Sequence, residues 1–211
     1  MHLSAIQLDR AVGAVLASAA GDALGSQYEF GPPLPDDARV TFGRGALGHA
    51  NGEWTDDTSM AMPILQVLAE GRDLTDADTL AAVVHGWKRW MPTSPDVGIQ
   101  TRRVLGSLPE NATEDDARAA ARRIHEAEGR SGGNGSLMRT GPGALGYLDD
   151  GQEAALADAA GRVAQLTHWE DDNVHACVLW CFAIRHAVRT GELDPVAGLA
   201  WVPEERRARW A

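Results

Sequence analysis

Residues 52–70 read GEWTDDTSMAMPILQVLAE, a polar turn that leads directly into a strongly helical run. From Thr58 to Glu70 the apolar residues recur at helical spacing, and Gly71 is a suitable stop. Carboxylates and hydroxyls stand next to one another where the loop enters this helix. The segment therefore predicts a helix whose first turn carries a concentrated group of acidic side chains.

Helical periodicity recurs on both sides of this segment, whereas the sequence lacks a sustained period-2 run rich in Val, Ile and aromatic residues. Thr113 and the three acids after it predict a capped helix N-terminus, with basic residues in the later turns. The expected helices cover residues 6–20, 58–70, 78–91, 99–108, 113–129, 152–165 and 171–190, and another begins at Pro203. The sequence thus predicts one compact, multi-helix, all-α domain over residues 1–211.

Composition narrows the class of protein. With 211 residues the chain can bury one sizeable core, and a net charge of -11 without a basic face argues against binding to a nucleic-acid backbone. Neither a signal-peptide pattern nor an apolar run of ~18 residues is present, so a membrane partner is not expected. Cys177 and Cys181 are spaced i to i+4 in an apolar helical run and are expected to be core residues. Together these features favour a cytoplasmic protein.

The acidic group after residue 52 has two interpretations. Thr55, Asp56 and Asp57 offer hard oxygen ligands, which suit Mg²⁺, Mn²⁺ or Ca²⁺ better than Zn²⁺. Thr and Asp are also favoured at helix N-termini, where acids interact well with the helix dipole. Taken alone, this segment favours capping over metal binding.

Three further segments place polar residues at expected helix ends. Residues 21–29, GDALGSQYE, put Asp22 and Glu29 either at a cleft or at an ordinary helix end followed by a turn. Residues 131–139, SGGNGSLMR, can present backbone N–H groups to phosphate oxygens or form a flexible connector, and they match neither a Walker A loop nor a Rossmann fingerprint. His168 either contacts a ligand or satisfies local backbone groups.

Five motifs in order resemble the ADP-ribosylglycohydrolase family: GDALGSQYE at 21–29, GEWTDDT at 52–58, DVGIQT at 96–101, GGNGSLMR at 132–139 and TH at 167–168. Each motif is weak alone, and the specificity lies in their shared order along the whole chain. The resemblance implies an all-α fold with a cleft that holds two divalent cations, Mg²⁺ or Mn²⁺. It also implies hydrolysis at the anomeric carbon of the distal ribose, which releases ADP-ribose from a modified protein side chain or a small molecule, through an oxocarbenium-like state.

The resemblance assigns roles position by position. Thr55, Asp56 and Asp57 match the first half of the metal site, and Glu29 matches the acidic residue near the reacting ribose. The catalytic residues implied are therefore Glu29, Asp56 and Asp57. The residues expected to contact the substrate are Asp22, Asp96, Gly98, Thr101, Gly133, Asn134, Gly135, Ser136, Met138 and His168.

One departure from the family pattern leaves the activity open. Family members carry an Asp-x-Asp-Thr segment near the C-terminus, whereas the match in this chain is residues 76–79, which stand soon after the first motif and are typical of a helix cap. The chain is therefore expected to be truncated at its C-terminus. One alternative is a non-catalytic ADP-ribose-binding or structural member of the same fold, and another is a helical metallohydrolase with an unrelated substrate.

Overall fold

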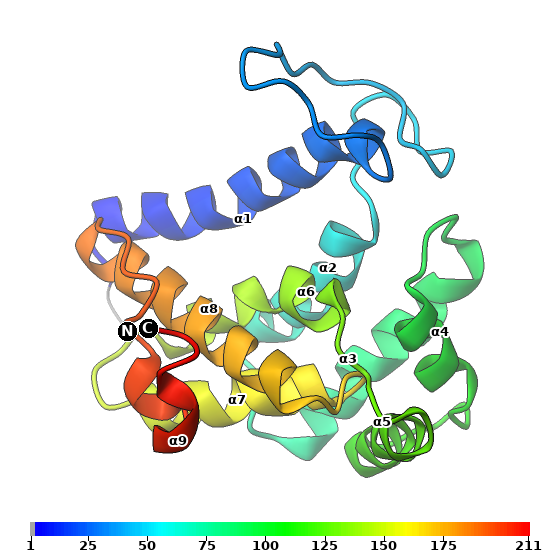
Figure 1. The fold of residues 1–211 in the computed structure, drawn as a ribbon. Coiled ribbons are helices and arrows are strands. Elements are labelled where there is room, and N and C mark those ends of the chain that lie inside the picture. The colour runs from blue at the N-terminus through cyan, green and yellow to red at the C-terminus, as the bar shows by residue number, and fades with distance from the viewer. Residues whose placement is uncertain (1–2) are drawn as a thin grey trace.

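Helices and their connecting loops make up the computed structural model, which describes residues 3–211 (Figure 1). Within that range the β structure is limited to an isolated bridge between Arg44 and Asn51, so the all-α prediction is confirmed. The α-helices are α1 Ala5–Gly25, α2 Asp56–Ala69, α3 Ala77–Trp90, α4 Ile99–Gly106, α5 Glu114–Glu128, α6 Leu137–Thr140, α7 Glu153–Gln165, α8 Asp171–Thr190 and α9 Glu204–Arg207. Short 3-10 turns, η1 Ser26–Tyr28, η2 Met91–Thr93, η3 Asn134–Ser136, η4 Gly141–Tyr147 and η5 Leu199–Trp201, join several of them.

The hydrophobic core lies between α2, α3, α7 and α8, with η4 packed against α8. Trp87 of α3 is fully buried there, and its indole N–H donates to the Met60 carbonyl of α2 at 2.8 Å. Gly86 allows the two helices to approach closely, since a Cβ at this position would lie 2.7 Å from Cβ of Pro63. Burying a large apolar side chain contributes about 1.5–3 kcal/mol. This core therefore holds the helices in fixed positions, and with them the polar residues at their ends.

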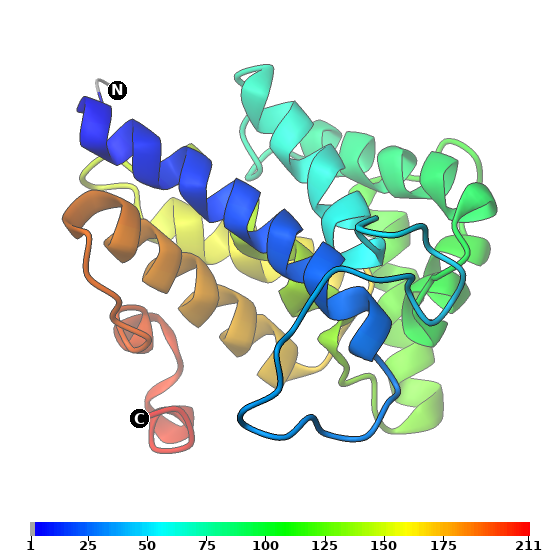
Figure 2. The same ribbon diagram turned by 90° about the horizontal axis from the view of Figure 1, so that it is seen from above.

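Helix α1 lies across the surface, against α8 and α2 (Figure 2). Ala11 and Ala23 are its buried residues, while Ile6 and Leu16 remain largely exposed. The sequence predicted that this helix ends near Gly21, but it continues to Gly25. A glycine inside a helix costs only about 1 kcal/mol, and Asp22, in the extra turn, accepts hydrogen bonds from the start of α2.

Other helix boundaries agree with the sequence to within about two residues. Thr113 forms the predicted cap of α5, since its hydroxyl accepts from the Asp116 N–H at 3.2 Å. Asp76 occupies the N-cap position of α3, although its side chain makes no capping hydrogen bond. The glycine-rich segment differs from the expected loop, because residues 134–147 form successive helical turns. Over residues 3–211, the helices lack the combination of length and apolarity that spanning a membrane requires.

Candidate functional site

The N-terminus of α2 is capped by a carboxylate that belongs to α1. Both oxygens of Asp22 accept from the Thr55 N–H at 3.0 Å, and one also accepts from the Thr58 N–H at 3.0 Å. The hydroxyls of Thr55 and Thr58 donate to the same carboxylate at 2.7 and 2.6 Å. Thr55 stands at the N-cap position but does not cap through its own side chain. Asp22 therefore holds the two motifs together.

Asp56 and Asp57 lie beside this cap, in the first turn of α2. Burial, followed by the charge of Asp96, raises the pKa of Asp56 to about 6. Burial, followed by the charges of Asp22 and Asp56, raises the pKa of Asp57 to about 7. These carboxylates are thus held near one another and partly away from water, which opposes ionisation.

Glu29 and Asp96 belong to the same acidic cluster, which we define as Asp22, Glu29, Asp56, Asp57 and Asp96. Burial is the main cause that raises the pKa of Glu29, and the charge of Asp96 adds to it. Burial also raises the pKa of Asp96, with a further contribution from Asp22. The structure therefore brings together acids from the end of η1, α1, α2 and the segment before α4.

The chemistry of this cluster fits one side of a divalent cation site. Thr55, Asp56 and Asp57 supply hydroxyl and carboxylate oxygens, which hard cations prefer. A cation would also offset the mutual repulsion that raises the carboxyl pKa values. Among residues 3–211, however, there is no group of three His, Cys, Asp or Glu side chains arranged to hold a metal ion.

His49 adjoins the cluster, and motif reasoning missed it. This side chain comes from the long loop between α1 and α2, is buried, and when charged lowers the pKa of both Glu29 and Asp96. A Cβ on Gly45 would lie 2.8 Å from Cβ of His49, so the glycine makes room for it. The surrounding Gly- and Pro-rich sequence carries no periodic signal that would have indicated burial.

The glycine loop, residues 130–136, is braced by the start of α8. The Ser131 N–H donates to the Glu170 carboxylate at 2.8 Å, and the Asn173 amide donates to the Gly133 carbonyl at 2.7 Å and to the Ser136 hydroxyl at 2.6 Å. A hollow of about 390 Å³ adjoins the loop and is lined in part by Gly133 and Asn134. These bonds argue against the flexible-connector interpretation.

His168 and Thr101 lie on another side of the same loop. A Cβ on Gly135 would lie 2.8 Å from Cε1 of His168 and 3.3 Å from Oγ1 of Thr101. Gly98 is the N-cap of α4, in whose first turns Thr101 is buried. Burial, followed by the charge of Arg139, lowers the pKa of His168 to about 3, so this histidine is neutral.

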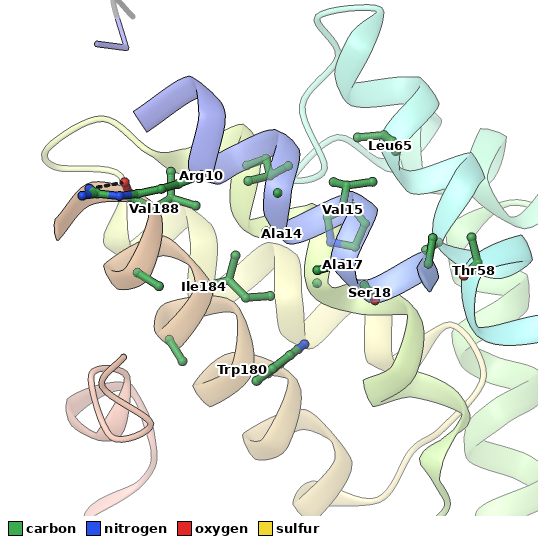
Figure 3. A pocket seen from close by; sticks show the side chains of 18 of the residues that line it. Arg10, Ala14, Val15, Ala17, Ser18, Thr58, Leu65, Trp180, Ile184 and Val188 are labelled. Carbon is green, nitrogen blue, oxygen red and sulfur yellow. Dashed lines mark hydrogen bonds between the residues drawn. The ribbon is translucent and has the colours of Figure 1, made fainter. Parts of the chain in front are cut away.

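A larger hollow, with mostly apolar walls, reaches Thr58, whose hydroxyl donates to Asp22. It is an apolar groove of about 600 Å³ between α1, α2, η4 and α8, with Val15, Leu65 and Ile184 among its walls (Figure 3). At one edge Arg10 donates to the Val188 carbonyl at 3.4 Å. Met138, expected at the substrate, lines this groove and packs against the core. A groove of this composition does not suit a charged sugar phosphate.

The fold and these side chains define an all-α protein with an acidic cluster at one helix end and a braced glycine loop nearby. The model of the family described as ADP-ribosylglycohydrolase matches residues 3–210, and the chain belongs to this family. The family prediction made from the five motifs is confirmed.

Similar proteins share this family. The chain is 32% identical over 178 residues to the ADP-ribosylarginine hydrolase Tri1 of Pseudomonas putida, covering 82% of this chain and 45% of the relative. It is 32% identical over 188 residues to the ADP-ribosyl-[dinitrogen reductase] glycohydrolase of Rhodospirillum rubrum, covering 85% and 58%. A solved structure described as an ADP-ribosylglycohydrolase-related protein complex has a TM-score of 0.68 at 32% identity, covering 96% of this chain and 62% of that chain. The chain thus spans about half the length of the curated relatives it matches.

Proposed function

We propose that this chain supplies the substrate-binding and acidic part of a hydrolase that removes ADP-ribose from a modified arginine side chain. Family membership supports hydrolysis, and relatives named as an ADP-ribosylarginine hydrolase and a dinitrogen reductase glycohydrolase support a protein-linked substrate. The observation that carries the proposal is the placement of the acidic cluster near the braced glycine loop. Asp96 belongs to the cluster, and Thr101, five residues later, lies against Gly135 of the loop.

In the proposed reaction, water attacks the anomeric carbon of the distal ribose. A new C–O bond forms, the bond to the arginine nitrogen breaks, and the leaving guanidine takes up a proton. Glu29 accepts the proton that water loses; burial, followed by the charge of Asp96, raises the pKa of this carboxyl group above its ordinary value, which makes the carboxylate a stronger base. The glycine loop binds the diphosphate through backbone N–H groups and holds the ribose in place.

We further propose that Thr55, Asp56 and Asp57 hold a divalent cation, Mg²⁺ or Mn²⁺, as part of a site for two. Such a cation, when bound, orients the ribose hydroxyls and polarises the attacking water. Asp22 contributes by holding Thr55 and Thr58 in position through four hydrogen-bond donors.

The test is release of ADP-ribose from an arginine-modified peptide, measured by mass spectrometry with Mg²⁺ and with a chelator. A serine-modified peptide reports linkage specificity. We expect release from the arginine peptide with Mg²⁺, strong loss in Asp57→Asn, and little change in Asp158→Asn, a surface control on α7. A folded chain that binds the peptide but releases nothing under either condition would contradict the hydrolase proposal.

A second candidate is an ADP-ribose-binding protein without catalysis. It is favoured by the lack, in residues 3–211, of three side chains grouped to hold a metal ion. Calorimetry with ADP-ribose separates the two functions, since binding without peptide hydrolysis supports this candidate. Absence of both binding and hydrolysis would contradict both.

A further inference from the structure

Arg139 of α6 places a fully buried positive charge behind the glycine loop. Its guanidinium carbon lies 4.0 Å from the centre of the Trp87 ring, and burial lowers the pKa of Arg139 to about 9. One terminal nitrogen donates to the Thr167 hydroxyl at 2.6 Å and to the Val163 carbonyl at 3.3 Å. A buried positive charge is costly unless hydrogen-bond partners satisfy it, so Arg139 and its partners are held in fixed positions relative to one another.

The Thr167 hydroxyl links Arg139 to His168. Thr167 is fully buried, and its oxygen lies 2.7 Å from Nδ1 of His168. Arginine only donates, so the Thr167 oxygen is an acceptor towards Arg139 and its own hydrogen remains to be placed. Among the described residues, the acceptor available to the Thr167 hydroxyl hydrogen is Nδ1 of His168. If Nδ1 carried a hydrogen instead, a buried hydroxyl would lose its acceptor, which costs about 1–3 kcal/mol.

A neutral histidine whose Nδ1 accepts must carry its hydrogen on Nε2. The Nε2 atom faces the glycine loop, because a Cβ on Gly135 would lie 3.2 Å from it and a Cβ on Gly133 would lie 3.6 Å from it. These two glycines thus keep space free in front of the Nε2–H group. Protonation of the ring is opposed by burial and by the nearby charge of Arg139.

We propose that Thr167, oriented by Arg139, is a positioning residue that fixes His168 in the Nε2–H tautomer and directs this neutral donor to a phosphate or ribose oxygen at the Gly133–Gly135 loop. The proposal rests on the proposed function for the identity of the ligand, ADP-ribose, but not for the tautomer itself. A neutral donor at this point recognises an oxygen acceptor without adding positive charge beside Arg139. The hydrogen is supplied in one fixed direction, because Thr167 and the ring are both buried.

The experiment combines ¹⁵N NMR of the histidine rings with ADP-ribose calorimetry, using the whole chain at neutral pH. The His168 resonances are assigned by their loss in His168→Gln. We expect the Nε2–H tautomer in the wild-type chain and in Thr167→Ser, which keeps the hydroxyl. In Thr167→Val, of similar shape, we expect mixed tautomers and ADP-ribose affinity weaker by about 5- to 20-fold, the loss of one buried hydrogen bond.

The two readouts separate this proposal from the proposed function. An Nδ1–H tautomer or a charged ring in the wild-type chain would overturn the proposal without any variant, and so would an unchanged tautomer in Thr167→Val. The expected tautomer pattern without ADP-ribose binding would support the positioning by Thr167 and count against the proposed function instead. Should Thr167→Val fail to fold, the wild-type and Thr167→Ser spectra still decide the tautomer.

Discussion

Replacing Asp22 tests whether α1 and α2 are joined by the cap seen in the structure. The Asp22 carboxylate accepts from two N–H groups and two hydroxyls at the start of α2, at distances of 2.6 to 3.0 Å. In Asp22→Ala the two N–H groups lose their cap, which costs about 0.5–2 kcal/mol. Both threonines are buried, so loss of the two charge-assisted bonds from the Thr55 and Thr58 hydroxyls adds about 1.5–3 kcal/mol each.

One effect opposes this loss. The charge of Asp22 contributes to the raised pKa of Asp57 and of Glu29, so removing it relieves repulsion. For charges near a protein surface, such relief is on the order of 1 kcal/mol. We therefore expect a net decrease of about 2.5–7 kcal/mol in the free energy of unfolding for Asp22→Ala, and about half of that for Asp22→Asn, which keeps one acceptor oxygen.

The assay is urea unfolding at pH 7.5, followed by circular dichroism and extrapolated to water. Asp9→Ala is the matched control, because Asp9 is an exposed acid on the same helix. The control should change the free energy of unfolding by less than about 0.5 kcal/mol. An Asp22→Ala loss no larger than that of Asp9→Ala would refute the reasoning, since it would mean that the cap does not bind α1 to α2.

Three other outcomes are expected. The pKa of Asp57 in the folded chain, about 7, exceeds its ordinary value of 3.8, so the folded state binds the extra proton between these values. The free energy of unfolding should therefore fall as pH rises from about 4 to about 7, and less steeply in Asp57→Asn. Mg²⁺ should raise the melting temperature at pH 8, where the carboxylate is ionised, but not at pH 5. Equal effects of Mg²⁺ at both pH values would contradict this. Gly135→Ala should weaken ADP-ribose binding at least about tenfold, because its Cβ would lie 2.8 Å from the His168 ring. Gly132→Ala should bind normally in calorimetry, because its Cβ would make only ordinary contacts, at 3.7 Å or more. Asn173→Ala should increase hydrogen exchange in residues 131–136 by freeing the glycine loop; unchanged exchange would show that Asn173 is not its brace.

The sequence predicted most helices because their signals are local. Periodicity located α8 to the residue, and the cap of α5 followed from Thr113 and Asp116. The stop at Gly21 was wrong because the turn after it is held by contacts with α2, which lie more than 30 positions away in the chain. Local propensity cannot indicate a contact of that kind.

The candidate site was predictable only where a motif marks it. Arg139, His49 and Asn173 are polar residues whose positions depend on tertiary packing, and none was assigned a role from the sequence. Arg139 did lie at the end of a quoted motif, but its burial against Trp87 required the folded structure. His49 lies in a loop without periodicity, so only the fold brings it to the acidic cluster.

The raised pKa of Asp57 bears on the capping interpretation of the acidic turn. A carboxylate that serves only as part of a helix N-terminus gains about 0.3–1 kcal/mol from the dipole, which lowers its pKa. Asp57 shows the opposite, since burial and neighbouring acids raise its pKa from 3.8 to about 7. A tenfold change in acidity is about 1.4 kcal/mol, so even half of this rise exceeds the dipole effect. The start of α2 is already capped by Asp22, so capping alone does not account for two further acids whose pKa values are raised. The proposed cation would offset their mutual repulsion.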